Sequence, residues 1–321
     1  MKRKILKYLI INSFMLLIVL QVGLINQTTV YAKNKNDVRA LKHIIKVQRK
    51  RGADVSKNIN NKREYRWKNG RLVKINWESS YIKGNLNLNK FIKLESVEIG
   101  DNRLTDLYIN KCKKLKYLDC QSNKLKKISI NKCKKLKYLY CSRNKLERIK
   151  INSLNNLKVF NCDRNKILKL DLSNNKELAY LDCAFNKLKE LNLSNNSKLV
   201  SLWCNYNKLE GLDLRNCKLT TGVNCSNNKL KRILLRNNMK LEYLYIYDNL
   251  LADIPFNKIR YVELLHCFGN NIKEIDMNRF EYYPASIWCD KNVKIYGWNS
   301  EEYVYKIEVS GKTADYTIDL K

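Results

Sequence analysis

The chain has 321 residues, of which 45% are hydrophobic, so it can bury a core in one elongated domain or in two compact ones. Lys and Arg number 63 against 30 Asp and Glu, and the formal net charge of +33 predicts adhesion to polyanions at low salt. Only two histidines occur in the whole sequence, which argues against a histidine-based metal or catalytic centre.

Residues 1–32 have the pattern of a secretory signal. A basic start, MKRKILK, precedes the apolar run YLIINSFMLLIVL, and the small residues Val30 and Ala32 follow. We expect cleavage after Ala32 and a soluble mature chain, secreted or held at the bacterial cell surface. The alternative is an uncleaved anchor, because residues 8–25 are about long enough to span a bilayer.

Residues 33–66 are expected to form an N-terminal helical cap. The segment NDVRALKHIIKVQRKRG (36–52) has a capping residue, Asn36 or Asp37, at its start and Gly52 at its end. One face of this helix is apolar and is expected to cover the first coil of the following repeats; it consists of Val38, Leu41, Ile44 and Ile45.

A 21-residue repeat occupies residues 67–282. After an incomplete first strand at 67–77, the motif L-x-x-L-x-C-x-x-N-x-L-x-x-L-x-L begins at residues 94, 115, 136, 157, 178, 199, 220, 241 and 262. The ninth position is Asn in every copy: Asn102, Asn123, Asn144, Asn165, Asn186, Asn207, Asn228, Asn249 and Asn270. The sixth is Ile99, Cys120, Cys141, Cys162, Cys183, Cys204, Cys225, Ile246 and Cys267. Because Ile cannot bind a metal, the sixth position is an apolar slot.

Each copy is predicted to form one coil of a solenoid. Residues such as YLDC alternate inward and outward as a short strand requires, and strands of successive coils stack in parallel about 4.8 Å apart. The first, fourth, sixth, eleventh, fourteenth and sixteenth positions then face the core. The Asn amide satisfies loop groups that water does not reach.

The return segments also alternate with period two, as in KISIN (127–131), so extended convex segments are expected in place of helices. In the seventh copy Thr220 and Val223 occupy leucine slots, which predicts a local irregularity. Residues 283–321 are expected to form a β-rich C-terminal cap, with strands at 292–298, 303–309 and 314–320 and a hairpin between the last two. Such a cap covers the open end of the solenoid.

The repeat resembles the leucine-rich repeats of the internalin J type, which are 21 residues long and carry a cysteine ladder in secreted bacterial proteins. The resemblance covers residues 67–282. It implies a leucine-rich-repeat solenoid, α/β by convention but mostly β, with stacked parallel strands on its concave face. It says little about the ligand.

The cysteines are not spaced for a zinc site, because they recur at intervals of 21 and not in C-x-x-C pairs. Disulfides between stacked sixth positions are disfavoured, since in-register Cβ atoms lie about 4.8 Å apart and a disulfide prefers about 3.8 Å. We therefore expect buried thiols there. The redox state of Cys112, Cys133, Cys217 and Cys289 stays open.

Catalysis is not expected. A cysteine nucleophile needs exposure and a nearby base, whereas the repeated cysteines face inward and histidine is nearly absent. Neither G-x-S-x-G nor H-E-x-x-H occurs. We predict a protein without catalytic residues, metal, cofactor or small-molecule substrate.

The outward positions of the strands and the loops after them are rich in aromatic residues, which we predict to bind a ligand: Tyr117, Tyr138, Tyr140, Tyr180, Trp203, Tyr206, Tyr243 and Tyr245. Tyr and Trp offer a large contact area with little loss of rotamer freedom. The alternative is that aromatic residues favour strands and pack along the sheet for stability alone.

The tenth position forms a basic row that we predict to bind a polyanion: Lys124, Lys145, Lys166, Lys187, Lys208 and Lys229. Charges about 5 Å apart repel one another within the Debye length of about 8 Å, and a linear polyanion would relieve this repulsion. The alternative is a solvated turn position where lysine is tolerated.

These features predict an exported recognition protein that binds a host or bacterial surface protein or glycan, with its basic surface retaining it on an anionic wall polymer. One alternative is a purely electrostatic binder of wall polymer or nucleic acid. Export argues against nucleic acid as the partner. Another alternative is a secreted inhibitor or structural component.

Overall fold

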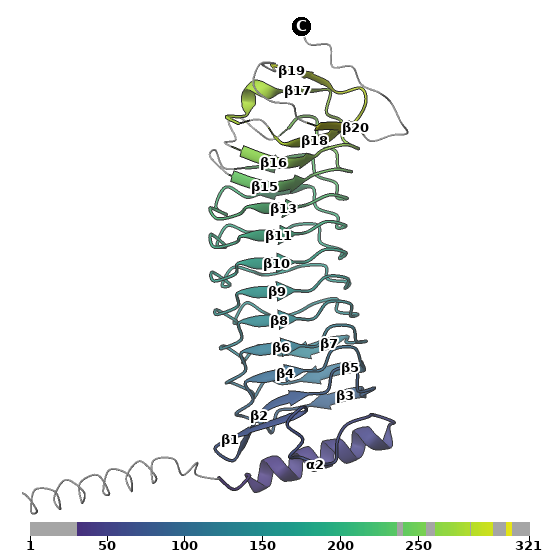
Figure 1. Ribbon diagram of the computed structural model, residues 1–321, viewed down its shortest axis with the longest axis vertical. Coiled ribbons are helices and arrows are strands. Elements are labelled where there is room, and N and C mark those ends of the chain that lie inside the picture. Colours follow the sequence, from purple (N-terminus) through teal and green to yellow (C-terminus); the bar gives the residue numbers. More distant parts are fainter. Residues whose placement is uncertain (1–30, 236–239, 255–260, 283, 298–305, 310–321) are drawn as a thin grey trace, which may run out of the picture.

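The computed structural model describes residues 31–235, 240–254, 261–282, 284–297 and 306–309. Strands are stacked along the long axis of an elongated solenoid, and helix α2 (Lys35–Lys50) lies beneath the first coil (Figure 1). The expected signal segment, apart from its last two residues, and the expected strand at 314–320 lie outside the described residues. In the described part of the chain, no helix combines the length and apolar character needed to cross a bilayer.

The N-cap of helix α2 lies two to three residues before the expected capping residues. Asn34 is the N-cap, because its side-chain oxygen accepts the backbone N–H groups of Asn36 and Asp37, both at 3.1 Å. The expected caps, Asn36 and Asp37, are thus inside the helix. The Asp37 carboxylate instead accepts two hydrogen bonds from the Arg71 guanidinium, at 2.8 and 2.9 Å, which joins the helix to the first coil.

The apolar face of α2 covers the end of the solenoid, as expected. Leu41 and Ile45 are buried in the core, and Ile44 is partly buried against it. Gly52, with φ of 89°, follows the helix end in a left-handed conformation that glycine adopts without strain.

The main sheet contains thirteen strands among the described residues, in the order β1-β2-β4-β6-β8-β9-β10-β11-β13-β15-β16-β18-β20. The β1–β2 pair is antiparallel and every later neighbour is parallel. The bounds are β1 Tyr65–Lys68, β2 Arg71–Asn76, β4 Ser96–Glu98, β6 Tyr117–Asp119, β8 Tyr138–Tyr140, β9 Val159–Asn161, β10 Tyr180–Asp182, β11 Ser201–Trp203, β13 Gly222–Asn224, β15 Lys240–Tyr245, β16 Tyr261–His266, β18 Ser286–Cys289 and β20 Lys306–Val309.

Pairing is in register, so equivalent positions of successive copies lie side by side. Tyr117 pairs with Tyr138, for example, and Leu118 with Leu139. Each position of the repeat therefore forms a row along the solenoid. The parallel sheet continues past residue 282, because β18 pairs with both β16 and β20.

The convex side carries shorter sheets and, among the described residues, no α-helix. Their bounds are β3 Lys83–Asn87, β5 Arg103–Tyr108 and β7 Lys127–Ser129 in one sheet, β12 Gly211–Asp213 and β14 Arg232–Leu234 in a second, and β17 Glu274–Asp276 and β19 Lys294–Tyr296 in a third, with the 3-10 helix η1 at Met277–Arg279. The expected convex stack is thus present towards both ends of the solenoid. In the middle, residues 148–152, 169–173 and 190–194 do not pair as strands.

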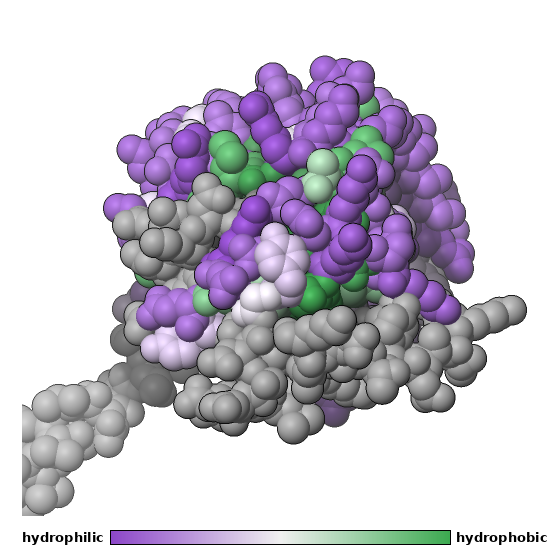
Figure 2. Space-filling model, turned by 90° about the horizontal axis from the view of Figure 1, so that it is seen from above, coloured by the Kyte–Doolittle hydropathy of each residue, from purple (hydrophilic) through white to green (hydrophobic). Residues whose placement is uncertain are grey.

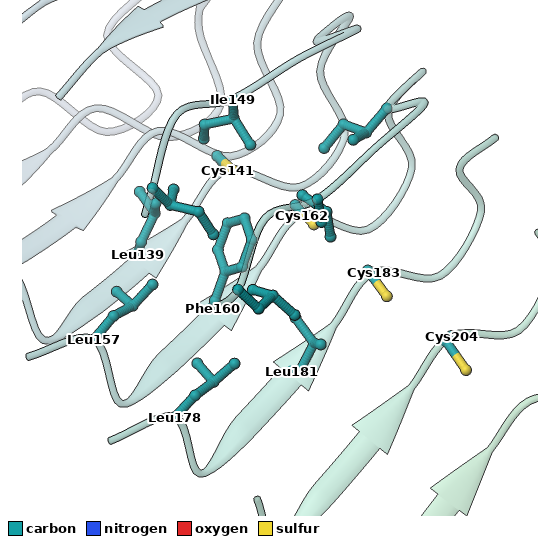
Figure 3. Packing of buried hydrophobic residues seen from close by; sticks show 14 of the residues in the cluster. Leu139, Cys141, Ile149, Leu157, Phe160, Cys162, Leu178, Leu181, Cys183 and Cys204 are labelled. Atoms are coloured by element: carbon teal, nitrogen blue, oxygen red, sulfur yellow. The ribbon is translucent and has the colours of Figure 1, made fainter. Parts of the chain in front are cut away.

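The inward rows form one continuous core. Fourth-position residues such as Leu139, Phe160 and Leu181 point to the same interior as the sulfur atoms of Cys162 and Cys183 (Figure 3). Seen down the long axis, hydrophobic residues are visible between the hydrophilic residues of the coloured part of the surface (Figure 2). Each fully buried Leu contributes roughly 1.5–3 kcal/mol, so the core dominates the stability of the solenoid.

The cysteines are buried thiols. All eleven are free, including the four whose state the sequence left open. At the nineteenth position the thiol of Cys133 donates to the carbonyl of Ile109 in the preceding coil, at 3.3 Å. Burial raises the pKa of the Cys133 thiol to about 12 and of Cys217 and Cys289 to about 11, which suppresses the reactive thiolate.

The Asn of each repeat joins neighbouring coils through its amide. The amide nitrogen of Asn144 donates to the carbonyls of Cys120, Cys141 and Ser142 at 3.0, 3.1 and 3.0 Å. Its oxygen accepts the backbone N–H of Leu125 at 2.9 Å. The predicted role of the ninth position is confirmed, because one side chain satisfies four backbone groups at the loop.

The residue before this Asn is left-handed in every copy. The eighth-position φ lies between 49° and 53° in the first eight copies, at Asp101, Ser122, Arg143, Arg164, Phe185, Tyr206, Asn227 and Asp248. In the ninth copy the residue is Gly269, with φ of 65°. This conformation turns the chain sharply after the strand, which directs the Asn amide inward.

The predicted irregularity of the seventh copy is small. Thr220 is buried in the leucine slot, and its hydroxyl donates to the carbonyl of Leu199 at 2.7 Å. The displaced Leu219 is 56% exposed. Because β13 still pairs with β11 and β15, the sheet is uninterrupted.

Candidate functional site

The outward side of the main sheet forms the candidate binding face. We call the third, fifth and seventh positions of the nine copies, between residues 96 and 268, the central track. Seven of the eight predicted aromatic residues lie on it: Tyr117, Tyr138, Tyr140, Tyr180, Trp203, Tyr243 and Tyr245. Tyr138 is 38% exposed and the other six are partly buried. The eighth predicted residue, Tyr206, lies beside the track at the eighth position and is 44% exposed.

Three tyrosines form a first aromatic cluster on strands β6 and β8. The ring of Tyr117 lies 6.3 Å from that of Tyr138 and 5.7 Å from that of Tyr140, centre to centre. The rings are tilted by 43° and 47°, and their separations lie in the range of favourable aromatic pairs. Burial, followed by the nearby Asp119 carboxylate, raises the pKa of Tyr117 to about 12, so its hydroxyl keeps its proton at neutral pH.

A second aromatic cluster extends from β11 to β18. Trp203 and Tyr243 are 6.1 Å apart and Tyr243 and Tyr245 are 5.2 Å apart. His266 then stacks between Tyr245, at 4.5 Å, and Trp288, at 4.8 Å. The five rings form a continuous aromatic surface across successive strands.

Trp288 was absent from the predicted ligand-binding residues. It lies on β18, beyond the last complete copy of the repeat. A signal was present in the sequence, because Ile287–Trp288–Cys289 reproduces the pattern of Leu202–Trp203–Cys204 at the fourth to sixth positions. The pairing of Trp288 with His266 confirms that register.

Gly222 creates the space in which Tyr243 lies. A Cβ atom at Gly222 would be 2.3 Å from the Tyr243 ring, well inside van der Waals contact. The Tyr243 hydroxyl is 3.2 Å from that of Ser201, two copies away. The tyrosine therefore lies along the sheet over Gly222 and bridges three strands.

A further stack borders the track at the eighth position. Phe185 and Tyr206 are stacked at 4.2 Å with an interplanar angle of 12°. The guanidinium of Arg164 lies 4.1 Å from the centre of the Phe185 ring, a favourable cation–π distance. Tyr180 lies on β10, one of the two strands between the two aromatic clusters.

Carboxylates accompany the aromatic rings on the track. Burial raises the pKa of Asp119, and the neighbouring acids Glu78, Glu98 and Asp101 add to the effect. Burial likewise raises the pKa of Asp182 to about 6. Both carboxylates thus lie where negative charge is less well solvated than in water.

The six predicted polyanion-binding lysines are all exposed at the loops that follow the strands. Their backbone N–H groups donate to carbonyls of the preceding coil; that of Lys145, for example, donates to the carbonyl of Leu125 at 2.9 Å. Within the described residues, none of the six side chains forms an ion pair with a carboxylate. The row therefore presents uncompensated positive charge beside the track.

Among the residues that the structure describes, no group of three or more His, Cys, Asp or Glu is placed to hold a metal ion. The sulfur atoms of the sixth position lie in the apolar core.

Comparison with known proteins agrees with this architecture. The family model for the leucine-rich repeat matches residues 135–157. The functional domain of InlJ from Listeria monocytogenes, described as including a cysteine ladder, is 24% identical; the match covers 70% of this chain and 68% of that one, with a TM-score of 0.51. YopM from Yersinia pestis, a leucine-rich effector protein, is 23% identical over 69% of this chain and 70% of that one, with a TM-score of 0.50. No curated protein matches in sequence.

The molecule therefore has the fold of a leucine-rich-repeat protein. More particularly, its solenoid is similar to that of InlJ, and its sixth-position cysteines form a buried ladder. The resemblance drawn from the repeat motif is confirmed.

Proposed function

We propose that this protein is an exported, non-enzymatic recognition protein that binds a surface protein or glycan through the aromatic concave face. The observation that carries the proposal is the grouping of partly exposed aromatic rings into two clusters on one side of one sheet. Core packing alone explains the inward rows and does not require these rings outside. Export rests on the signal pattern at residues 1–32.

A double replacement of Tyr138 and Tyr140 by alanine tests the concave face. Both side chains leave the sheet outward, so the variant should fold normally and lose binding to a panel of immobilised surface proteins and glycans. The matched control replaces Tyr108, on convex strand β5, and the exposed Tyr282. Equal binding by both double variants would rule out the first aromatic cluster as part of the site.

The lysine row favours a second activity, retention on an anionic polymer. The proposal rests on six exposed and unpaired cations at one position of successive coils. A triple replacement of Lys145, Lys166 and Lys187 by glutamine should lower the salt concentration at which the protein elutes from immobilised teichoic acid. The control replaces Lys126, Lys150 and Lys189, which are also exposed and remove the same charge. Equal elution of the two triple variants would show that net charge alone binds the polymer.

A further inference from the structure

The central track differs in charge from the rest of the molecule. Lys and Arg are 63 of the 321 residues, so a stretch of 27 positions would hold about five by composition. The 27 positions of the track hold none. Their charged residues are all acidic: Glu98, Asp119, Asp163 and Asp182. A strongly basic protein thus has a concave centre without cations.

Two of these acids form no ion pair in the described part of the chain, although the charge of Arg164 acts on Asp182. Glu98 forms an ion pair with Lys74 at 2.6 Å, and Asp163 lies 3.6 Å from the guanidinium of Arg164. Asp119 and Asp182 form no ion pair with any residue that the structure describes.

The fold itself does not require their charge. The carboxylate of Asp182 accepts the backbone N–H of Ala184 at 3.1 Å, which closes the turn after the strand. The amides of Asn161 and Asn224 close the equivalent turns at 3.0 and 3.2 Å. A neutral Asn therefore does this work in two other copies, and the charge of the Asp is additional to it.

Tyrosine rings accompany both acids on the same face. Asp119 shares strand β6 with Tyr117 of the first aromatic cluster, and Asp182 shares β10 with Tyr180. Aromatic faces together with an unpaired carboxylate attract ammonium and guanidinium groups, through cation–π contact and charge-assisted hydrogen bonds. Neither the aromatic faces nor the carboxylates favour an anionic ligand.

We propose that the central track recognises a polypeptide that presents Lys or Arg side chains to Asp119 and Asp182. The inference rests on the proposed function and deepens it by naming the chemistry of the partner. The two acids are three coils apart, or about 14 Å at the usual strand spacing, which about four residues of extended chain span. The lysine row beside the track repels further cations, so the partner carries its Lys or Arg singly among neutral or acidic residues.

The test uses the full chain and synthetic probes, with calorimetry and intrinsic tryptophan fluorescence as readouts. A neutral Gly/Ser peptide with two lysines four residues apart should bind, and the same peptide with norleucine or glutamate in their place should not. Asp119→Asn and Asp182→Asn should each weaken binding by about tenfold, the usual size of one charge-assisted contact, without altering the turns. The control, Glu147→Gln with Glu210→Gln, removes two exposed acids outside the track and should bind as the parent does.

Two further probes identify other occupants. Choline alone tests whether a free ammonium is sufficient, and binding as strong as that of the dilysine peptide would overturn the polypeptide assignment. A neutral oligosaccharide that binds equally to the parent and to the Asp variants would overturn the cationic one.

The outcome separates the two proposals. If the Tyr138 and Tyr140 double variant loses binding to the surface panel while the Asp variants retain it, the concave face is the site and the cationic partner is wrong. If neither set of changes affects binding, both proposals fail.

Discussion

The two faces of each short strand follow different rules. On the inward face most positions hold apolar side chains, as the sixth holds Cys or Ile. On the outward face the fifth position is in turn acidic, amide, phenolic, indole or imidazole. The comparison shows that the inward residues, which repeat every 21 positions, specify the solenoid. The outward residues, which vary from copy to copy, specify the chemistry of the concave surface. The following predictions test that division, from the largest expected effect to the smallest.

Replacing the inward-pointing Asn144 by leucine should cause the largest loss of stability. The backbone N–H of Leu125 loses its partner, and a buried unpaired group costs about 1–3 kcal/mol. The carbonyls of Cys120, Cys141 and Ser142 each lose one of their two donors. Urea unfolding should therefore show a loss of about 2–4 kcal/mol. Asn155→Leu, at an exposed position, is the control and should change little. A similar midpoint for the two variants would contradict the bridging role of the amide.

Gly222→Ala should have a smaller effect that is confined to the outward face. The new Cβ forces the Tyr243 ring away, because the two would be only 2.3 Å apart. We expect about 1–3 kcal/mol of destabilisation and a change in the near-ultraviolet circular dichroism of the second aromatic cluster. Gly211→Ala is the control, since its nearest neighbour atom would be 3.6 Å away. An unchanged aromatic spectrum for Gly222→Ala would show that Tyr243 lies elsewhere.

Asp182→Asn should stabilise the protein slightly above pH 6. The pKa of Asp182 rises from 3.8 to about 6 on folding, so the folded chain binds this proton more tightly than the unfolded chain does. Stability from this group therefore falls as pH rises from about 4 to about 6. Asp182→Asn removes this loss of stability, because asparagine does not ionise. Its urea midpoint should exceed that of the parent at pH 7.5 and approach it at pH 4; a gain of equal size at both values would exclude titration of Asp182 as the cause.

Thiol reagents should have the smallest effect on the native protein. All eleven cysteines are buried and free, and burial raises the pKa of their thiols. Dithionitrobenzoate at neutral pH should react with almost none of them in the folded state. In urea, without reductant, eleven thiols should react. A lower count in urea would reveal disulfides in the ladder.

Most of the fold could be predicted from the sequence because the signal is repeated nine times. A single L-x-x-L-x-C motif is ambiguous, but in-phase copies require the same side chains to point inward in every coil. Thr220, for example, is buried where the motif places a leucine. The start of the N-terminal helix occurs once, so no repetition helps to locate it. Asn34, Asn36 and Asp37 can all cap a helix, and only the three-dimensional chain path selects Asn34.

The candidate site was predictable as a set of residues but not as a geometry. Outward positions follow from the strand period, which places Tyr117 and Tyr243 on the same face. The period does not determine which rings meet. That depends on rotamers and free space, such as the gap over Gly222 that lets Tyr243 reach Ser201. The two acids of the further inference were missed because Asp119 and Asp182 are two among many scattered carboxylates until the absence of Lys and Arg from the central track is counted.

The left-handed eighth position also limits how the protein could be redesigned. A non-glycine residue at φ near 50° costs backbone energy, of the order of 1 kcal/mol, and Gly269 demonstrates that glycine fits the same turn. Arg164, Phe185 and Tyr206 occupy that position nonetheless, and their stacked side chains border the concave face. Glycine at all three positions would relieve the backbone strain of the loops and remove the stacked side chains from the edge of the concave face. Changes at the eighth position that raise thermal stability would therefore lower ligand affinity.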